Sequence, residues 1–148
     1  MAVDWKLAQQ KSARTAHWAV TMTKVRIRRV LSQTRWQLVT FDGKAGGESK
    51  GIVDLMAIRK DFGKTIPGTK HGDALQIILI QVKGGKAAMP TTEDGKRLGA
   101  VARRLHARRP MLAVWKKGAA AQFFRYQPRA TEKAKEWIKV SDLDAVFH

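Results

Sequence analysis

The chain has 148 residues, 44% of them hydrophobic, which is enough for the core of one compact domain and too little for two. It has no Cys, no run near the roughly 20 apolar residues of a membrane span and no apolar stretch like a signal peptide, so we expect a soluble, intracellular, cytoplasmic protein without disulfides, thiolate zinc sites or a membrane partner. Its 29 Lys and Arg against 12 acids give a net charge of +17, which is typical of proteins that bind polyanions.

The first half of the chain predicts a helical segment followed by three strands. Residues 3 to about 35 contain no Gly or Pro, and their apolar residues recur at helical spacing. Residues 36–41 alternate and favour a strand, while residues 52–58 are nearly all apolar and predict a strand buried on both faces. The third predicted strand covers residues 74–83, after a hairpin connection over 59–73.

The second half predicts a helix, two strands and a short tail helix. The sequence from Pro90 to Glu93 indicates a helix start with Thr91 or Thr92 as N-cap, and Pro110 would end that helix. The predicted apolar face of this helix consists of Leu98, Val101, Ala102 and Leu105. Strands are expected over 111–115 and 121–126, and a helix over 131–138.

This order predicts a single domain over residues 1–148 of the α/β (α+β) class. We expect a mixed central sheet of about five strands flanked by helices. The N-terminal helical segment would cover about 3–35, the core about 36–127 and a C-terminal tail about 128–148.

Polar residues interrupt two of the apolar strands. Asp54 is the single polar residue of the predicted strand 52–58. Gln81 and Lys83 lie at the end of the predicted strand 74–83, and because they are two positions apart their side chains share one face of it. Burying an unpaired carboxylate or ammonium costs several kcal/mol, so we expect these side chains to converge on one another and on a ligand. The structural alternative is an Asp–Lys ion pair at the edge of the sheet.

Residues 50–58, followed by Gln81-Val82-Lys83, resemble the PD-(D/E)xK nuclease superfamily, in which an Asp on one strand precedes (D/E)xK on the next. The order of elements is similar from about residue 24 to 126. The stretch Asp54-Leu55-Met56-Ala57-Ile58 looks like that of archaeal-type Holliday junction resolvases, and the Gln-x-Lys motif is similar to that of Mrr-type restriction endonucleases.

The resemblance implies a restriction-endonuclease-like fold and hydrolysis of DNA phosphodiester bonds with Mg²⁺ or Mn²⁺. Asp54 would be the anchoring metal ligand, with the Gln81 amide and the Val82 carbonyl beside it, and Lys83 would orient or help deprotonate the attacking water. The superfamily often supplies another Glu from its first helix, and this helix has none. Glu48 is the nearby candidate to replace it, and with Asp54 as the only charged ligand the site would hold metal poorly.

Two stretches are strongly basic. From Gly95 to Arg129 there are ten basic residues and no acid, and from Met1 to Trp36 there are eight against Asp4 alone. The structural alternative is a solvent-exposed basic face, although such a face usually has acidic residues among the basic ones that reduce its net charge. We expect the arginines of the first stretch to lie beside the Gly84-Gly85 turn. The side chains expected to contact DNA phosphates are Ser49, Lys50, Lys86, Arg103, Arg104, Arg108 and Arg109.

The function favoured by these features is a structure-specific DNA endonuclease of the kind that resolves Holliday junctions, in DNA recombination or repair. Branched or double-stranded DNA would be its partner, read by shape and phosphate position. Symmetric cuts on two strands favour a homodimer. The alternatives are a nuclease-like fold that binds nucleic acid without cutting it, and a basic RNA-binding protein. The four histidines, at 17, 71, 106 and 148, show no pair at ligand spacing, so no zinc site is expected.

Overall fold

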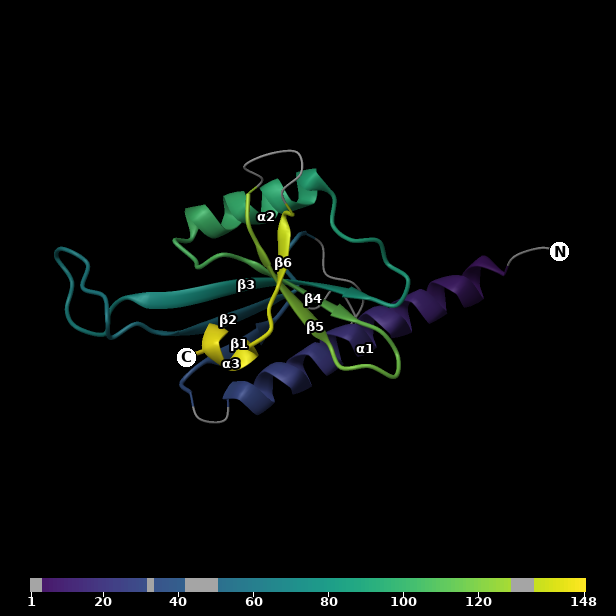
Figure 1. The fold of residues 1–148 in the computed structure, drawn as a ribbon, viewed down its shortest axis with the longest axis horizontal. Coiled ribbons are helices and arrows are strands. Elements are labelled where there is room, and N and C mark those ends of the chain that lie inside the picture. The colour runs from purple at the N-terminus through teal and green to yellow at the C-terminus, as the bar shows by residue number, and fades with distance from the viewer. Residues whose placement is uncertain (1–3, 32–33, 42–50, 129–134) are drawn as a thin grey trace.

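A six-stranded mixed sheet with helices on both faces forms the body of the molecule (Figure 1). The computed structural model describes residues 4–31, 34–41, 51–128 and 135–148. The strands lie in chain order across the sheet: β1 (Gln37–Thr40), β2 (Leu55–Lys60), β3 (Leu75–Gly84), β4 (Met111–Trp115), β5 (Gln122–Tyr126) and β6 (Trp137–Lys139). The helices are α1 (Trp5–Leu31), α2 (Thr92–Arg104) and α3 (Leu143–Val146). The predicted mixed sheet flanked by helices is confirmed.

Neighbouring strands are antiparallel except β3 and β4, which are parallel. Two parallel strands begin at the same edge of the sheet, so the chain must run back across the sheet from the end of β3 to the start of β4. Helix α2 makes that return, which places its C-terminal end near the start of β3. This path decides where the basic residues that follow α2 lie.

Two apolar layers form because successive side chains of a strand point to opposite faces of the sheet. On one face Ile78 and Ile80 of β3 pack with Ile27 of α1. On the other face Leu79 packs with Leu98 of α2. Figure 1 shows α1 and α2 on opposite sides of the sheet. Within the described part of the chain, no helix is long and apolar enough to cross a membrane.

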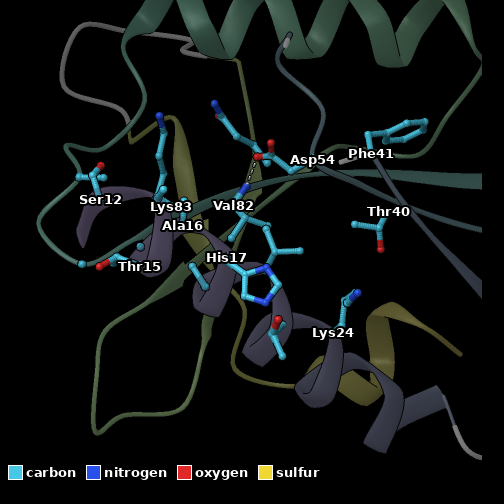
Figure 2. A pocket seen from close by; sticks show the side chains of 18 of the residues that line it. Ser12, Thr15, Ala16, His17, Lys24, Thr40, Phe41, Asp54, Val82 and Lys83 are labelled. Carbon is cyan, nitrogen blue, oxygen red and sulfur yellow. Dashed lines mark hydrogen bonds between the residues drawn. The ribbon is translucent and has the colours of Figure 1, made fainter. Parts of the chain in front are cut away.

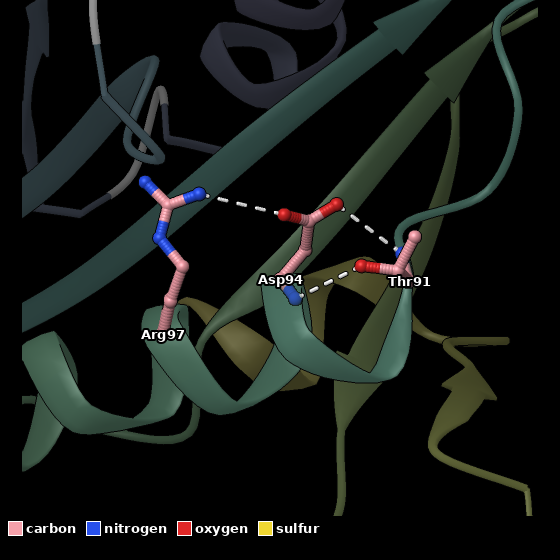
Figure 3. A network of polar contacts seen from close by, with 3 residues as sticks. All are labelled: Thr91, Asp94 and Arg97. Atoms are coloured by element: carbon pink, nitrogen blue, oxygen red, sulfur yellow. Dashed lines mark hydrogen bonds and ion pairs between the residues drawn. The ribbon is translucent and has the colours of Figure 1, made fainter.

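Helix α2 begins with a complete capping box (Figure 3). The Thr91 hydroxyl accepts a hydrogen bond from the Asp94 backbone N–H at 3.1 Å, and an Asp94 carboxylate oxygen accepts one from the Thr91 N–H at 3.2 Å. The other Asp94 oxygen lies 3.5 Å from the Arg97 guanidinium. The prediction of a helix start at Thr91 or Thr92 is therefore confirmed, with Thr91 as the N-cap.

The end predicted for this helix is wrong. The helix stops at Arg104, and His106 adopts a left-handed backbone with φ 50°. That reversal lets the Arg108 N–H donate to the Ile77 carbonyl of β3 at 2.8 Å, so the segment before Pro110 runs beside the sheet. Leu105, predicted as part of the apolar face, is consequently 46% exposed.

Two further predictions need correction. The second strand begins at Leu55, three residues later than predicted, because Ile52 and Val53 leave the ladder to pack in the layer under α2. The tail helix over 131–138 is wrong at its described end, since Trp137–Lys139 forms β6 against β5; residues 131–134 lie outside the described residues. The indole of Trp137 packs 5.2 Å from the ring of Tyr126, which favours the strand. Helix α3 was not predicted.

Candidate active site

Asp54 lies in the bend directly before β2, against the end of β3 that carries Gln81 and Lys83. One carboxylate oxygen, Oδ2, accepts a hydrogen bond from the Val82 backbone N–H at 2.7 Å (Figure 2). The Asp54 N–H in turn donates to the Ile80 carbonyl at 3.0 Å. These bonds tie the bend to β3 and fix the direction of a half-buried carboxylate.

Gln81 has a buried polar atom that the fold does not satisfy. Its side chain is 7% exposed, and within the described residues its Oε1 has no hydrogen-bond partner. A buried acceptor left without a donor costs about 1–3 kcal/mol, so such atoms are uncommon unless something else binds them. The Gln81 amide oxygen is therefore available to coordinate a cation or to accept a hydrogen bond from a ligand.

Strand alternation places Gln81 and Lys83 on the face of β3 that carries Leu79, whereas Val82 packs against the opposite layer. Figure 2 shows the side chains of Asp54 and Lys83 extending to one side of β3 and that of Val82 to the other. The sequence prediction that Gln81 and Lys83 share one face of this strand agrees with this placement.

A hollow of about 900 Å³ opens at this end of the sheet. Asp54, Gln81, Val82 and Lys83 line it on the side of the strands. Its described charged lining residues comprise Asp54 and four lysines, which makes the hollow a favourable place for a phosphodiester. The four lysines are Lys11, Lys24, Lys83 and Lys86.

Helix α1 forms the other wall of the hollow, and this contribution was missed in the sequence. Lys11, His17 and Lys24 all come from α1 (Figure 2 labels His17 and Lys24). The helix approaches because Gly84 has no side chain: a Cβ there would lie 2.6 Å from the Ala19 Cβ. The basic N-terminal stretch and the glycines after the third predicted strand were the available signals, but neither fixes which helix face meets the strand.

The donor set at the end of β3 fits a hard cation that keeps much of its own water. Asp54 supplies a carboxylate, and the Gln81 amide oxygen has no hydrogen-bond partner among the described residues. Mg²⁺ takes oxygen ligands and is often held by one or two carboxylates with several waters. Among the described residues no group of three or more His, Asp or Glu is close enough to hold a metal. Glu48, and the predicted DNA contacts Ser49 and Lys50, lie outside the described residues.

The four arginines predicted to contact DNA are exposed, as expected, but they do not lie beside Gly84-Gly85. The side chain of Arg108 donates to the Gln76 amide oxygen at 3.0 Å and to the Val146 carbonyl at 3.1 Å, near the start of β3. The prediction of their position was wrong because α2 carries the chain back along the sheet before they occur. The four exposed arginines are Arg103, Arg104, Arg108 and Arg109.

Arg108 also has a structural role that its charge did not suggest. Its guanidinium lies 5.5 Å from the Trp36 ring, and that of Arg59 lies 4.5 Å from the same ring. Both guanidiniums donate to the Gln76 amide oxygen. Burial and the neighbouring Arg108 charge lower the pKa of Arg59, partly offset by Asp61. Arg108 thus helps to fasten the C-terminal segment, and its charge is shared between that task and the surface.

The similarity of the chain to known proteins is distant. No protein-family model matches the chain, and no curated protein matches it. Among solved structures, the chain is similar to a Holliday junction resolvase from the archaeal hyperthermophile Archaeoglobus fulgidus, with 17% identity and a TM-score of 0.38 over 83% of this chain and 90% of that chain. A likeness this distant carries no argument about activity, so the proposals below rest on the residues of this chain.

Proposed function

We propose that the protein is a metal-dependent endonuclease that hydrolyses phosphodiester bonds in DNA, with Mg²⁺ or Mn²⁺ as its ion and branched DNA as its preferred substrate. One observation carries the proposal: the Asp54 carboxylate, held by the Val82 N–H, lies at the strand end where Gln81 has an unsatisfied buried amide oxygen and Lys83 follows on the same face.

The electrostatics of the hollow support a phosphodiester as the group that is bound. Four lysines line it, and the whole chain carries a net charge of +17. Such a surface attracts a polyanion and is strongest where the walls exclude water. A basic RNA-binding protein would share this charge, but the charge alone does not account for Asp54 and Gln81 in the lining of the hollow.

Each residue of the site would have a distinct role. Asp54 and the amide oxygen of Gln81, with the Val82 carbonyl, would hold the ion, which when bound neutralises charge on the phosphate and lowers the pKa of a coordinated water. The Val82 N–H keeps Asp54 in one orientation. Lys83 would place its ammonium against the phosphate and orient the attacking water. Lys11 and Lys86 would hold the DNA backbone at the rim of the hollow.

Cleavage of a supercoiled plasmid and of a labelled four-way junction tests this proposal, with Mg²⁺ or Mn²⁺ compared with EDTA. The proposal predicts cleavage of the junction only with metal, and loss of cleavage in Asp54→Asn. A matched control is Asp144→Asn, since Asp144 is exposed on α3. Cleavage that persists in EDTA, or in Asp54→Asn, would contradict the proposed site.

A second candidate function, DNA binding without cleavage, is favoured by one observation. Among the described residues that line the hollow, Asp54 is the one carboxylate, and the position where many nucleases have an acid is occupied by Gln81. If wild-type protein binds the junction but does not cut it at any metal concentration, while Gln81→Glu does, this candidate is the correct one.

A homodimer belongs to the proposed function because two symmetric cuts need two sites. Sedimentation of the protein alone and with a four-way junction measures this directly. We expect two chains on each junction. A complex with a single chain that still cuts both strands would contradict the dimer.

A further inference from the structure

The connection between β2 and β3 projects beyond the sheet as a hairpin arm, on the left of Figure 1. We call residues 61–74 the arm. At its tip Pro67 and Gly68 occupy the centre of a tight turn, in which the Thr69 N–H donates to the Ile66 carbonyl at 3.1 Å and Gly68 has φ 81°. Proline followed by a left-handed glycine is the pattern of a type II turn, which fixes the backbone of the tip.

The arm is braced below its tip. A second turn is closed by the Asp73 N–H, which donates to the Lys70 carbonyl at 3.1 Å. The ring of Phe62 packs 5.3 Å from that of His71, and the guanidinium of Arg35 lies 5.8 Å from the Phe62 ring. The arm is therefore an ordered hairpin, held by two hydrogen-bonded turns and by contacts between side chains.

Two apolar residues stand at the tip of the arm. Ile66 is 42% exposed, and Pro67 lies between Ile66 and the glycine of the turn. Isolated exposed apolar residues are common on proteins and need no explanation. Here, however, an isoleucine and a proline form the outermost turn of a projecting hairpin, where burial against the protein's own core is impossible.

The charge of the arm is arranged for a polyanion. Its two acids serve the backbone: an Asp61 carboxylate oxygen accepts from the Gly63 N–H at 3.0 Å, and one of Asp73 accepts from the Lys70 N–H at 2.8 Å. Lys60, just before the arm, and Lys64 and Lys70 within it are all exposed. The exposed arginines that follow α2 lie near the same end of the sheet, so the surface around the arm is also basic.

We infer that the arm is a DNA wedge, in which Ile66 and Pro67 insert between bases at a branch point or distorted step while Lys64 and Lys70 contact the flanking phosphates. Apolar side chains that include Ile and Pro enter base steps in this way in DNA-bending proteins. A branch or flexible step is already partly unstacked, so insertion costs least there. The inference rests on the proposed binding of DNA, and it does not require cleavage.

The arm and the candidate active site contact different parts of the DNA. Gln81 lies six positions after Leu75 along β3, which corresponds to roughly 20 Å at about 3.3 Å per residue. The arm extends beyond the end of β3 at which that strand begins (Figure 1). A substitution at its tip therefore leaves the groups around Asp54 unchanged, and the two activities can be tested separately.

The test uses a four-way junction with 2-aminopurine, a base whose fluorescence rises on unstacking, placed at the branch, in EDTA so that no cleavage occurs. Ile66→Ser removes the apolar tip and keeps the turn. Ile138→Ser is the matched control, because Ile138 is 38% exposed on β6. We expect wild type and Ile138→Ser to raise the fluorescence, and Ile66→Ser to lose most of the rise and about tenfold in affinity for the junction, with little loss on linear duplex.

A second variant, Lys64→Ala with Lys70→Ala, should reduce the salt dependence of junction binding by about two contacts, each worth roughly 0.9 in the log–log slope. Full fluorescence rise in Ile66→Ser would overturn the wedge. A shift of Ile66→Ser from dimer to monomer, without a change in fluorescence, would also overturn the wedge and would assign the arm to self-association. An equal loss of affinity for single-stranded RNA in this variant would overturn the wedge and assign the arm to RNA binding. Unstacking without cleavage in Mg²⁺ would overturn the endonuclease and leave the wedge intact.

Discussion

Replacing Gln81 by Met should raise the stability of the metal-free protein. The Gln81 side chain is 7% exposed and its Oε1 is buried without a partner among the described residues, so the folded state bears the cost of a desolvated carbonyl. That cost is about 1–3 kcal/mol, and Met has nearly the same shape without the carbonyl. For a chain of this length 1 kcal/mol shifts Tm by about 2–4 °C, so the variant should melt at least about 2 °C higher in EDTA.

The same substitution should remove the stabilisation by metal. A cation that binds the folded protein alone raises its stability by RT ln(1 + [L]/Kd), so wild type should melt higher as Mg²⁺ or Mn²⁺ is added. The variant should not respond, and the two melting curves should cross as the metal concentration rises. Thermal denaturation in EDTA and across a metal titration measures both effects. A lower Tm for the variant in EDTA would show instead that the Gln81 amide makes net favourable contacts within the fold.

The other predictions concern catalysis, charge and the position of α1. Asp54→Asn should abolish cleavage while junction affinity, measured by gel shift, stays the same or rises; weakened binding would indicate a structural carboxylate instead. Replacing Arg103, Arg104 and Arg109 together by Ala should flatten the log–log salt slope of DNA binding by up to about 2.7 without lowering Tm. Adding Arg108→Ala should lower Tm, because Arg108 also holds Gln76. An unchanged slope would mean that these arginines serve another partner. Gly84→Ala should cost about 1–3 kcal/mol, because its Cβ would lie 2.6 Å from that of Ala19, while Gly63→Ala should cost less in the same denaturation experiment.

The strands and the N-terminus of α2 could be predicted because their signals are local. Alternation and apolar runs mark β1 to β5, and the capping residues Thr91 and Asp94 are within one turn of each other. The error at the start of β2 has a physical cause: Ile52 and Val53 are apolar because they pack under α2, and an apolar residue outside a strand looks like one inside it.

The composition of the site could be predicted in part, and its surroundings could not. The period of a strand is enough to place Gln81 and Lys83 on one face. The lysines of α1 and the distance of the arginines from the site depend on how helices cross the sheet, which is set by the glycine at 84 and by the return path of α2. Similarly, β6 resembles a helix in sequence, and only its pairing with Tyr126 and Arg125 makes it a strand.

We propose that Asp54 and Gln81 make a divalent-cation site at the end of β3. Electron paramagnetic resonance of Mn²⁺, titrated with protein in the absence of DNA, counts bound ions directly. Binding that needs a deprotonated carboxylate should weaken as the pH falls. We expect one Mn²⁺ per chain for wild type and for the control Asp144→Asn, and loss of that ion in Asp54→Asn. Equal Mn²⁺ binding by wild type and Asp54→Asn would contradict it.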